Sequence, residues 1–458
     1  MRASIIAIAA FLIVPAGAGA QSLSDTLVTA YRNSPDLASA RAAVKVQAEN
    51  AVQARAQGRP FISGTATLDL EFDDFNEVVL PNTLGVTLSQ QLYTGGQIRN
   101  ATRAAETRIT AEQQRLQAIE QSVLLEALTA HLDVLRDAAF VELGIKNLRV
   151  LSEQLRAARE RFEVGEVTRT DVEQARAATA ASRSSLAASR GALVASREIY
   201  LRAVGRPPGD LQRPPPLPDV PASVPEAVSL ALVQDPALRA ARIERQAAGF
   251  DVKTAIGALL PQLELTAQAS RTDVLRDEDF LGNSIGAQTS GSVGLALTIP
   301  FYTGGLNYSN VRETQALVEA AVADITLAER TAVENVGSAY AALDVARASI
   351  EAGVLEVEAS QLAFEGVQEE AKVGARTTLD VLDAEADVLE AESDLVSARR
   401  DEAVAIYSIL ASVGLLTVEH LGLEIEPDNE DEYYDEVRDR FFGYDASEDT
   451  VWTTRWRP

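Results

Sequence analysis

Two carboxylates three residues apart, Asp380 and Asp383, form the side-chain pair in this sequence whose spacing is best suited to chemistry. Residues i and i+3 share one face of a helix, so a helix starting just before Asp380 would present both carboxylates together. Like charges at such a distance raise each other's pKa and attract cations. The alternative is that both are ordinary acids near a helix start, which the macrodipole favours by about 0.3–1 kcal/mol.

The sequence around this pair has a fainter counterpart earlier in the chain. The later stretch reads VGARTTLDVLDAEADVLEAE and the earlier one VGEVTRTDVEQARA. Each opens with a glycine turn, at Gly374 and Gly165, and continues into a helix whose acid stands at the same register, Asp380 and Asp171. Both pairs are 209 residues apart. We expect these turns to lie at the narrow end of a channel, with Asp383 completing an acidic pair on the second hairpin alone.

Other kinds of chemistry find little support in the composition. The chain has no cysteine, which excludes disulfides, thiol catalysis and cysteine-bound metals. Its two histidines, His131 and His420, are isolated and are expected to be structural or exposed. The sequence therefore predicts no catalytic residues, no metal site and no cofactor.

The charge balance is strongly acidic. Against 41 Lys and Arg stand 67 Asp and Glu, a net charge of −26, so nucleic acid is not an expected partner. Residues 424–449 alone contain twelve acids and two arginines. Such a block at a C-terminus is typical of a solvated, poorly ordered tail, and residues 416–458 are assigned as an acidic C-terminal tail. The aromatic residues of 433–444 are expected to pack locally against the tube of helices.

The first 20 residues have the three parts of a secretory signal. Arg2 supplies the charge, residues 4–14 the apolar core, and residues 18–20 a small-residue cleavage site before Gln21. The remainder has no apolar run long enough for a transmembrane helix.

Two tandem copies make up the rest of the chain. SLSDTLVTAYRNSPDL in the first matches SVPEAVSLALVQDPAL in the second at an offset of 201, and LYTGG matches FYTGG at an offset of 209. The copies span residues 21–206 and 223–415, joined by a proline-rich linker, 207–222, and the second carries an eight-residue insertion. The glycines of the two YTGG motifs lack the lysine of a phosphate loop and are read as strand-to-helix turns. They are Gly95, Gly96, Gly304 and Gly305.

Long proline-free runs predict the helices, because an interior proline costs a helix about 3 kcal/mol. The first copy is predicted to hold helices over 24–56, with a break possible at Pro35, and over 97–162 and 170–204. The second copy is predicted to hold helices over 225–256, 306–373 and 377–413. A helix of 66 residues is about 100 Å long and must run beside others in a coiled coil or tube.

Each copy also holds a pair of strands, within 60–93 and 261–302. Apolar and polar side chains alternate along these four segments of about ten residues. In the first segment, for example, the small and apolar residues Ile62, Gly64, Ala66 and Leu68 alternate with the polar residues Ser63, Thr65, Thr67 and Asp69. The pattern is typical of a membrane barrel strand, and the alternative is a half-buried strand of a soluble sandwich. Four strands cannot close a barrel, so a membrane location requires oligomerisation, and three copies would give twelve strands.

With these features the chain resembles the TolC family of outer-membrane efflux and secretion ducts. The resemblance rests on the tandem repeat, the strand pairs ending in YTGG, the proline-rich joint, and the motifs Phe162-x-x-Gly165 and ARTTLDVLDA. It implies a mainly α fold with a small membrane β part. In such a homotrimer a twelve-stranded barrel crosses the outer membrane and an α-helical tunnel extends into the periplasm. The tunnel would dock through a periplasmic adaptor onto an inner-membrane pump or ABC exporter.

The resemblance also implies roles for five residues. Asp380 and Asp383 correspond to the family's acidic ring at the periplasmic aperture. Thr170, Asp171 and Arg376 correspond to residues whose contacts hold that aperture shut.

Two positions depart from the family or its branches. Ala371 stands where the family has a tyrosine partner for the closing contacts. Gln21 stands where lipidated relatives carry a cysteine, so the chain resembles the non-lipidated branch.

The predicted function is a passive exit duct of a tripartite efflux or type I secretion system in the outer membrane. A soluble periplasmic coiled-coil scaffold or adaptor is the alternative, and an enzyme is the weakest reading. Drugs, secreted proteins and metal ions all stay open as the transported substrate.

Overall fold

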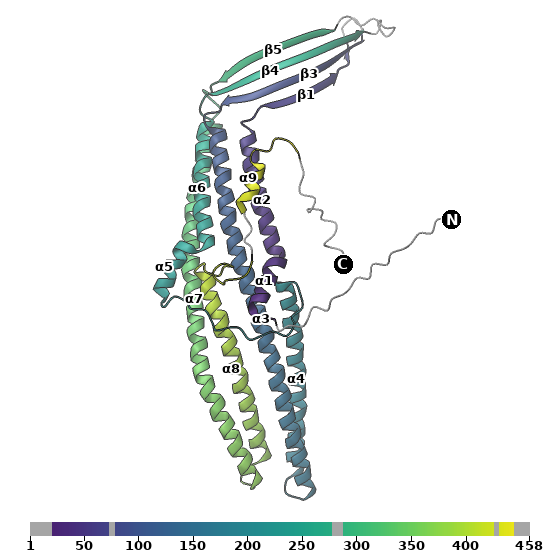
Figure 1. Ribbon diagram of the computed structural model, residues 1–458, viewed down its shortest axis with the longest axis vertical. Coiled ribbons are helices and arrows are strands. Elements are labelled where there is room, and N and C mark those ends of the chain that lie inside the picture. The colour runs from purple at the N-terminus through teal and green to yellow at the C-terminus, as the bar shows by residue number, and fades with distance from the viewer. Residues whose placement is uncertain (1–20, 73–77, 277–286, 426–429, 444–458) are drawn as a thin grey trace, which may run out of the picture. The chain divides into compact units, whose positions relative to one another are not determined.

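The computed structural model describes residues 21–72, 78–276, 287–425 and 430–443 (Figure 1). The predicted signal segment, residues 1–20, and the end of the predicted tail, residues 444–458, lie outside the described residues. The described chain is mainly helical with one small antiparallel sheet, which confirms the predicted fold class.

In the first copy, the described residues form four helices. They are α1 (Leu23–Asn33), α2 (Pro35–Ala56), α3 (Gln97–Glu163) and α4 (Arg169–Val204). The break between α1 and α2 falls at Ser34, before Pro35, because the residue preceding a proline is disfavoured in helical geometry.

The described part of the second copy forms four more helices. They are α5 (Val224–Gln234), α6 (Pro236–Gly257), α7 (Leu306–Lys372) and α8 (Thr378–Ser412). The prediction of one continuous helix over 225–256 is wrong. Asp235 interrupts it, and its carboxylate accepts hydrogen bonds from the backbone N–H groups of Ala237 (2.7 Å) and Leu238 (3.3 Å). Pro236 then occupies the first helical turn, where its missing N–H removes no helical bond.

The strands form one antiparallel sheet in the order β1-β3-β4-β5, with β2 paired to β3. Their bounds are β1 Phe61–Leu68, β2 Glu71–Phe72, β3 Val78–Tyr93, β4 Gln262–Arg276 and β5 Gln288–Thr298. β3 and β4, with 16 and 15 residues, are longer than the predicted ten or so. Backbone pairing between them continues from Val79↔Arg276 to Tyr93↔Leu263, beyond the alternating side-chain pattern that set the prediction.

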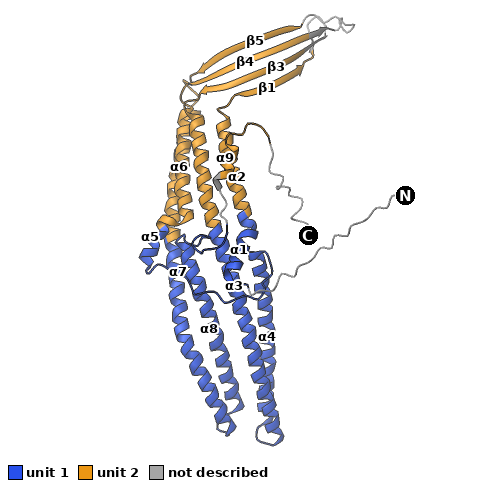
Figure 2. Ribbon diagram, in the orientation of Figure 1, with its two compact units in different colours: residues 1–37, 120–231, 333–425 blue, residues 38–119, 232–332, 426–458 orange. Residues whose placement is uncertain are grey.

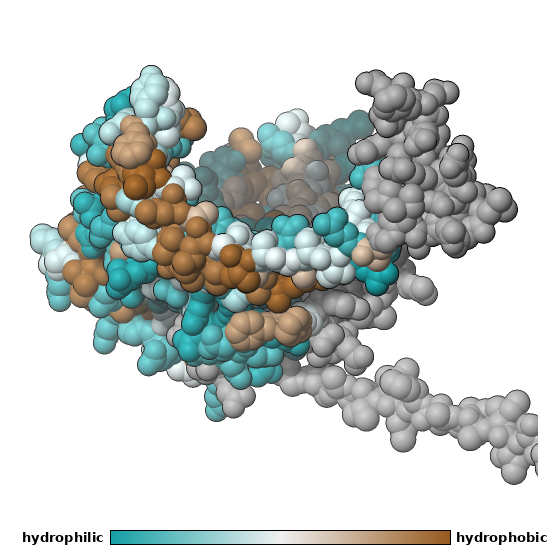
Figure 3. All heavy atoms as spheres, turned by 90° about the horizontal axis from the view of Figure 1, so that it is seen from above, coloured by the Kyte–Doolittle hydropathy of each residue, from teal (hydrophilic) through white to brown (hydrophobic). Residues whose placement is uncertain are grey.

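The register of the sheet sorts the side chains onto two faces, since residues directly opposite each other in an antiparallel pair share a face. One row across the four strands is apolar: Ile62, Leu88, Ala267 and Val293. The adjacent row is polar: Ser63, Thr87, Gln268 and Ser292. Figure 3 shows hydrophobic side chains gathered along the strands beside hydrophilic ones.

The chain divides into two compact units (Figure 2). Unit 1 comprises residues 1–37, 120–231 and 333–425, and unit 2 comprises residues 38–119, 232–332 and 426–458. The units therefore differ from the sequence repeats, because each takes segments from both copies. The long helices α3 and α7 each contribute residues to both units, so the border between the units does not coincide with the border between the two sequence copies.

Unit 1 has a core where α1, α3, α4 and α8 meet, and a buried polar network lies within it. His131 is fully buried and its ring nitrogens lie 3.0 Å from Thr26 Oγ1 and 3.1 Å from the carbonyl oxygen of Gln212. Burial lowers the pKa of His131. Gln21 donates through its side-chain amide to Tyr200 Oη (2.6 Å). His131 is thus a structural residue, whereas His420 is exposed.

The predicted disordered tail is partly folded, which corrects the compositional prediction. Leu416 and Leu423 are buried in the core of unit 1. In unit 2, residues Glu430–Val437 form α9, from which Tyr433 Oη donates to Glu49 (2.8 Å) and Tyr434 Oη donates to Glu106 (2.9 Å). Tyrosine hydroxyls paired with carboxylates give this acidic stretch specific partners, which net charge alone does not reveal.

Candidate functional site at the hairpin turns

The two hairpin turns of unit 1 are built alike. Gly165 (φ 83°) and Gly374 (φ 79°) both adopt the left-handed conformation, which glycine reaches without steric cost. The next residue closes each turn, with Glu166 N donating to Arg161 O (2.9 Å) and Ala375 N donating to Glu370 O (2.9 Å). This is the bonding of a glycine-terminated helix, and it reverses the chain from α3 to α4 and from α7 to α8.

A reciprocal capping box opens the helix after each turn. In α4, Thr168 N and Oγ1 donate to Asp171 Oδ2 (2.8 and 2.7 Å), and Asp171 N donates back to Thr168 Oγ1 (3.4 Å). In α8, Thr377 N and Oγ1 donate to Asp380 Oδ2 (2.9 and 2.8 Å), and Asp380 N donates back (3.3 Å). Sequence reasoning missed the threonines, although Thr-x-x-Asp is itself a capping signature.

The cap explains the electrostatic state of its two acids. Hydrogen bonds from Thr168 hold the pKa of Asp171 below its usual value, and bonds from Thr377 do the same for the pKa of Asp380. Within one chain, Asp380 therefore acts as an ordinary acid at the start of a helix, which is the alternative stated in the sequence analysis.

Asp383 differs from Asp380 in its surroundings. It is exposed one turn further along α8 and makes no hydrogen bond or ion pair with any described residue. The structure thus leaves one member of the predicted acidic pair as a free carboxylate.

The predicted closing contacts are not formed within one chain. Arg376 Nε pairs with Glu370 (2.8 Å), on the other side of its own turn, and this bond raises the pKa of Arg376. Among the described residues, Asp171 and Arg376 are not paired, and exposed Thr170 makes no hydrogen bond. Ala371 contributes a backbone contact to the turn: its carbonyl oxygen accepts a hydrogen bond from Gly374 N (3.2 Å).

A buried acid near the turn was missed at the sequence level. Glu385 lies one turn beyond Val381 and Leu382, and its exposed fraction is 8%. Burial, with a smaller contribution from Glu392, raises the pKa of Glu385 to about 7. The sequence did contain a signal for this burial: Glu385 lies four residues after Val381 and three residues after Leu382, so it shares the helix face of these apolar residues.

The YTGG glycines occupy the turns from β3 to α3 and from β5 to α7. All four have positive φ, at Gly95 (62°), Gly96 (84°), Gly304 (64°) and Gly305 (87°). At Gly95 space is limiting as well, because a Cβ there would lie 2.4 Å from the carbonyl oxygen of Gly257. These turns direct the chain from sheet to helix.

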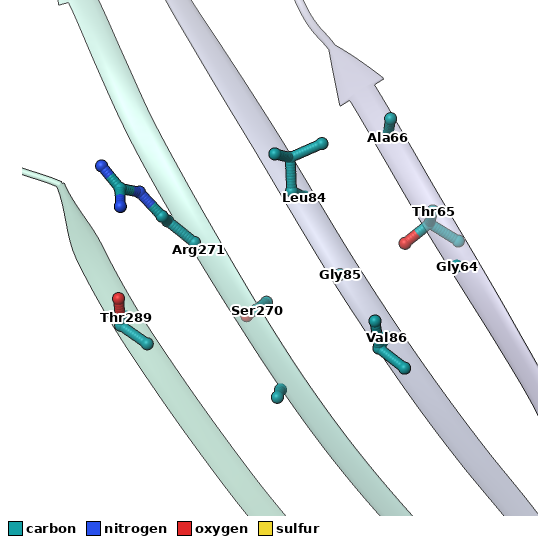
Figure 4. Close-up of a pocket in the computed structure, with 10 residues that line it drawn as sticks. Gly64, Thr65, Ala66, Leu84, Gly85, Val86, Ser270, Arg271 and Thr289 are labelled. Atoms are coloured by element: carbon teal, nitrogen blue, oxygen red, sulfur yellow. The ribbon is translucent and has the colours of Figure 1, made fainter.

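The sheet exposes its apolar side chains. Val293 and Leu295 are 78% and 66% exposed, and Phe301 and Tyr302 just after β5 are more exposed still. A hollow of about 490 Å³ lies over the strands and is lined by residues of β1, β3, β4 and β5. Figure 4 shows that two of these residues, Gly64 and Gly85, lie on neighbouring strands. Exposed apolar strands with aromatic residues at their ends are typical of a lipid-facing barrel surface.

The described residues contain neither a membrane-spanning helix nor a metal-binding cluster. No helix in that part of the chain is apolar over a sufficient length to span a bilayer. No cluster of three or more His, Asp or Glu side chains there is arranged to hold a metal ion.

Comparison with known proteins identifies the family. Residues 26–206 and 227–415 match the family described as outer membrane efflux protein. The chain belongs to this family. It is 35% identical to the outer membrane efflux protein BepC of Brucella suis over 423 residues, which cover 92% of each chain. It is 25% identical to the outer membrane protein TolC of Vibrio cholerae over 411 residues, covering 87% of this chain and 92% of the relative.

Solved structures share the fold of this family member. The CmeC outer membrane channel of Campylobacter jejuni matches with a TM-score of 0.76 at 19% identity, covering 90% of this chain and 88% of that one. The chain is accordingly an outer-membrane exit duct of the efflux or secretion type, located in the outer membrane and extending into the periplasm. A soluble periplasmic scaffold is excluded.

Proposed function

We propose that three copies of this chain form a passive duct that is gated at the hairpin turns. The observation that carries the proposal is the open sheet. Among the described residues, its outer strands β1 and β5 each have one unpaired edge, and its apolar side chains are exposed. Unpaired strand edges are not tolerated in lipid, so the edges must pair with those of other copies.

The number three follows from the need for a lumen. Two copies would give eight strands, and an eight-stranded barrel is filled by its own side chains. Three copies give twelve strands around a wider interior, lined by the Ser, Thr and Gln of the polar face.

Native mass measurement of the detergent-extracted protein tests this assembly. We expect extraction to require detergent and the particle to have the mass of three chains. A monomer or dimer that is stable across detergents would contradict the proposal.

The inner-membrane partners follow from the passive character of the duct. We propose that a periplasmic adaptor links the duct to an inner-membrane pump or ABC exporter, which supplies the energy, and that the chain itself is no enzyme. The name of the relative BepC supports efflux over protein secretion. Crosslinking in cells followed by mass spectrometry of the captured inner-membrane protein distinguishes a drug pump from a protein-exporting ATPase.

The aperture is proposed to be an acidic ring. Three copies would place six carboxylates, Asp380 and Asp383 of each chain, around one axis. The capping bonds that lower the pKa of Asp380 keep its carboxylate charged at neutral pH, so capping and cation attraction are compatible. Such a ring is expected to select cations and to bind multivalent ones.

A further inference from the structure

A row of arginines runs along the exposed side of α4. Five arginines recur at seven-residue intervals and all are exposed: Arg169, Arg176, Arg183, Arg190 and Arg197. A spacing of seven keeps side chains on one face of a helix in a coiled coil. Arg176 pairs with Glu173 of its own helix, while the other four make no ion pair with any described residue. We call this set the arginine stripe.

A matching row of carboxylates runs along α7. Four exposed acids recur at the same interval: Asp344, Glu351, Glu358 and Glu365. None of them has a hydrogen-bond or ion-pair partner in the part of the chain that the structure describes. We call this set the acidic stripe. The two helices also differ in total charge, since α4 has six basic and three acidic residues, and α7 has four basic and twelve acidic ones.

Each stripe borders an exposed seam of small and apolar residues. Beside the arginines, α4 exposes Ala177, Ala180, Ser184, Ala187, Gly191 and Val194. Beside the acids, α7 exposes Val345, Ala348, Ala352, Leu355, Ala359 and Leu362. Both seams have the alternating three- and four-residue steps of a coiled-coil core. Leu355 and Leu362 are 64% and 70% exposed, so this face of α7 is not covered by the described part of its own chain.

The arginine stripe and the acidic stripe each lie on the same side of the neighbouring seam. In each helix the charged residue lies three positions after one seam residue and one position before the next, as Glu358 does between Leu355 and Ala359. When two such helices pack antiparallel, that flank of one helix faces the same flank of the other. α4 leads away from its hairpin turn and α7 leads toward its own, so the two run antiparallel.

The heights of the charges also match. Counted from the turn glycines, Arg183 is 18 residues from Gly165 and Glu358 is 16 residues from Gly374. The same two-residue difference, about 3 Å of helix rise, holds for every member of the acidic stripe and its arginine partner. Rotation about an axis parallel to the helices leaves heights unchanged, so the match persists between copies related by such an axis.

We infer that α4 of one copy packs antiparallel against α7 of the next copy, with the arginine stripe paired to the acidic stripe. The occupant of each face is thus a second copy of this chain, and the inference rests on the proposed trimer. α4 contacts α8 of its own chain, with Ala175 of α4 and Leu382 of α8 in one buried cluster. Figure 1 shows α7 on the other side of α8 from α4. The residues of both stripes and both seams are exposed, so these faces of α4 and α7 are free to contact neighbouring copies.

Cysteine crosslinking tests the pairing, since the natural chain has no cysteine. One copy carries Arg183→Cys and a second, differently tagged copy carries Glu358→Cys; a short bismaleimide is added to the mixed, detergent-extracted assembly. We expect a crosslinked dimer containing both tags. Glu356→Cys is the matched control, because Glu356 is also an exposed acid of α7 but lies outside the stripe. Equal crosslinking of Glu356→Cys and Glu358→Cys in a trimeric protein would overturn the inference.

Charge reversal provides a second readout. Arg183→Glu with Arg190→Glu should reduce the yield of trimer, and adding Glu351→Arg with Glu358→Arg should restore it. A trimer of normal yield in the first variant would contradict the pairing and would favour an acidic helix of another protein as the occupant. A wild-type protein that is not trimeric would instead contradict the proposed function itself.

Discussion

Asp380 combines two roles that the sequence presents as alternatives. Its carboxylate caps α8 by accepting two hydrogen bonds from Thr377. These bonds stabilise the ionised form, so the acid at the start of the helix is also a permanent negative charge at the turn. Asp383 remains free of such contacts and exposed. At the residue scale, the acidic pair consists of one fixed and one free carboxylate.

The cap predicts a measurable contribution of Thr377. Thr377→Ala removes the hydroxyl that accepts from Asp380 N and should destabilise the first turn of α8 by about 1 kcal/mol. Hydrogen exchange of the amides in residues 378–381 measures this directly. Thr377→Ser keeps the hydroxyl and should exchange as the wild type does; equally fast exchange in both variants would rule out the cap as the cause.

Glu385 predicts a pH-dependent stability. Its pKa rises from an ordinary 4.5 to about 7 on folding, so the folded protein holds a proton that the unfolded chain releases between these values. The stability contribution of the protonated form is complete below about pH 4.5 and is lost as the pH rises to about 7. Glu385→Gln should therefore stabilise the protein at pH 8 by about 3 kcal/mol and have little effect at pH 4. Thermal unfolding at both pH values tests this, and an equal shift at the two would contradict it.

At the scale of elements, α9 shows where composition misleads. An acidic, proline-bounded segment has the composition of a disordered tail. Two tyrosines nevertheless fix it to α2 and α3. Burial, together with pairing to Glu49 and Glu106, raises the pKa of both tyrosines to about 12. The aromatic residues of 433–444 indicated local packing, but their partners, Glu49 and Glu106, are distant in sequence and could not be identified from it.

Removal of both tyrosine hydroxyls should release this helix. Tyr433→Phe with Tyr434→Phe loses two hydrogen bonds to carboxylates, each worth on the order of 1 kcal/mol at a partly exposed site. We expect a lower thermal midpoint and faster proteolysis of residues 430–443. Phe442→Ala alters an aromatic residue that is 92% exposed and should leave both measurements unchanged. Wild-type protease resistance in the double variant would show that other contacts hold α9.

The hairpins carry the prediction about gating. If Asp171 and Arg376 contact neighbouring hairpins in the assembly, Asp171→Ala with Arg376→Ala should raise single-channel conductance and increase antibiotic leakage into cells. Thr168→Ala is the control, because it breaks the same cap at α4 and leaves both charges in place. Wild-type conductance in the double variant would remove both residues from any gate.

For the whole molecule, periodicity made the fold predictable. Proline-free runs and two glycine turns gave α3 as 97–162 against the observed Gln97–Glu163, since a long helix is specified by local signals along its whole length. The prediction failed at 225–256 because this segment is not proline-free: Pro236 is the counterpart of Pro35, and the break before Pro35 was not carried over to the second copy.

The candidate site was predictable in part. Gly165, Gly374, Asp171 and Asp380 stood out by their shared offset, and the structure places them in equivalent turns. The local bond between Arg376 and Glu370 was not foreseen, because a contact across a turn depends on rotamers that the sequence does not fix. Contacts between copies are beyond one chain and stay predictions.

Planar-bilayer recording of the purified protein tests the central claim most directly. A trimeric duct with a ring of six carboxylates should show discrete single-channel steps, cation selectivity and block by multivalent cations. Asp380→Asn with Asp383→Asn should reduce both selectivity and block, while Asp387→Asn, an exposed acid one turn further along α8, should change neither. Absence of channel steps in the wild type, or unchanged selectivity and block in the double variant, would contradict the account.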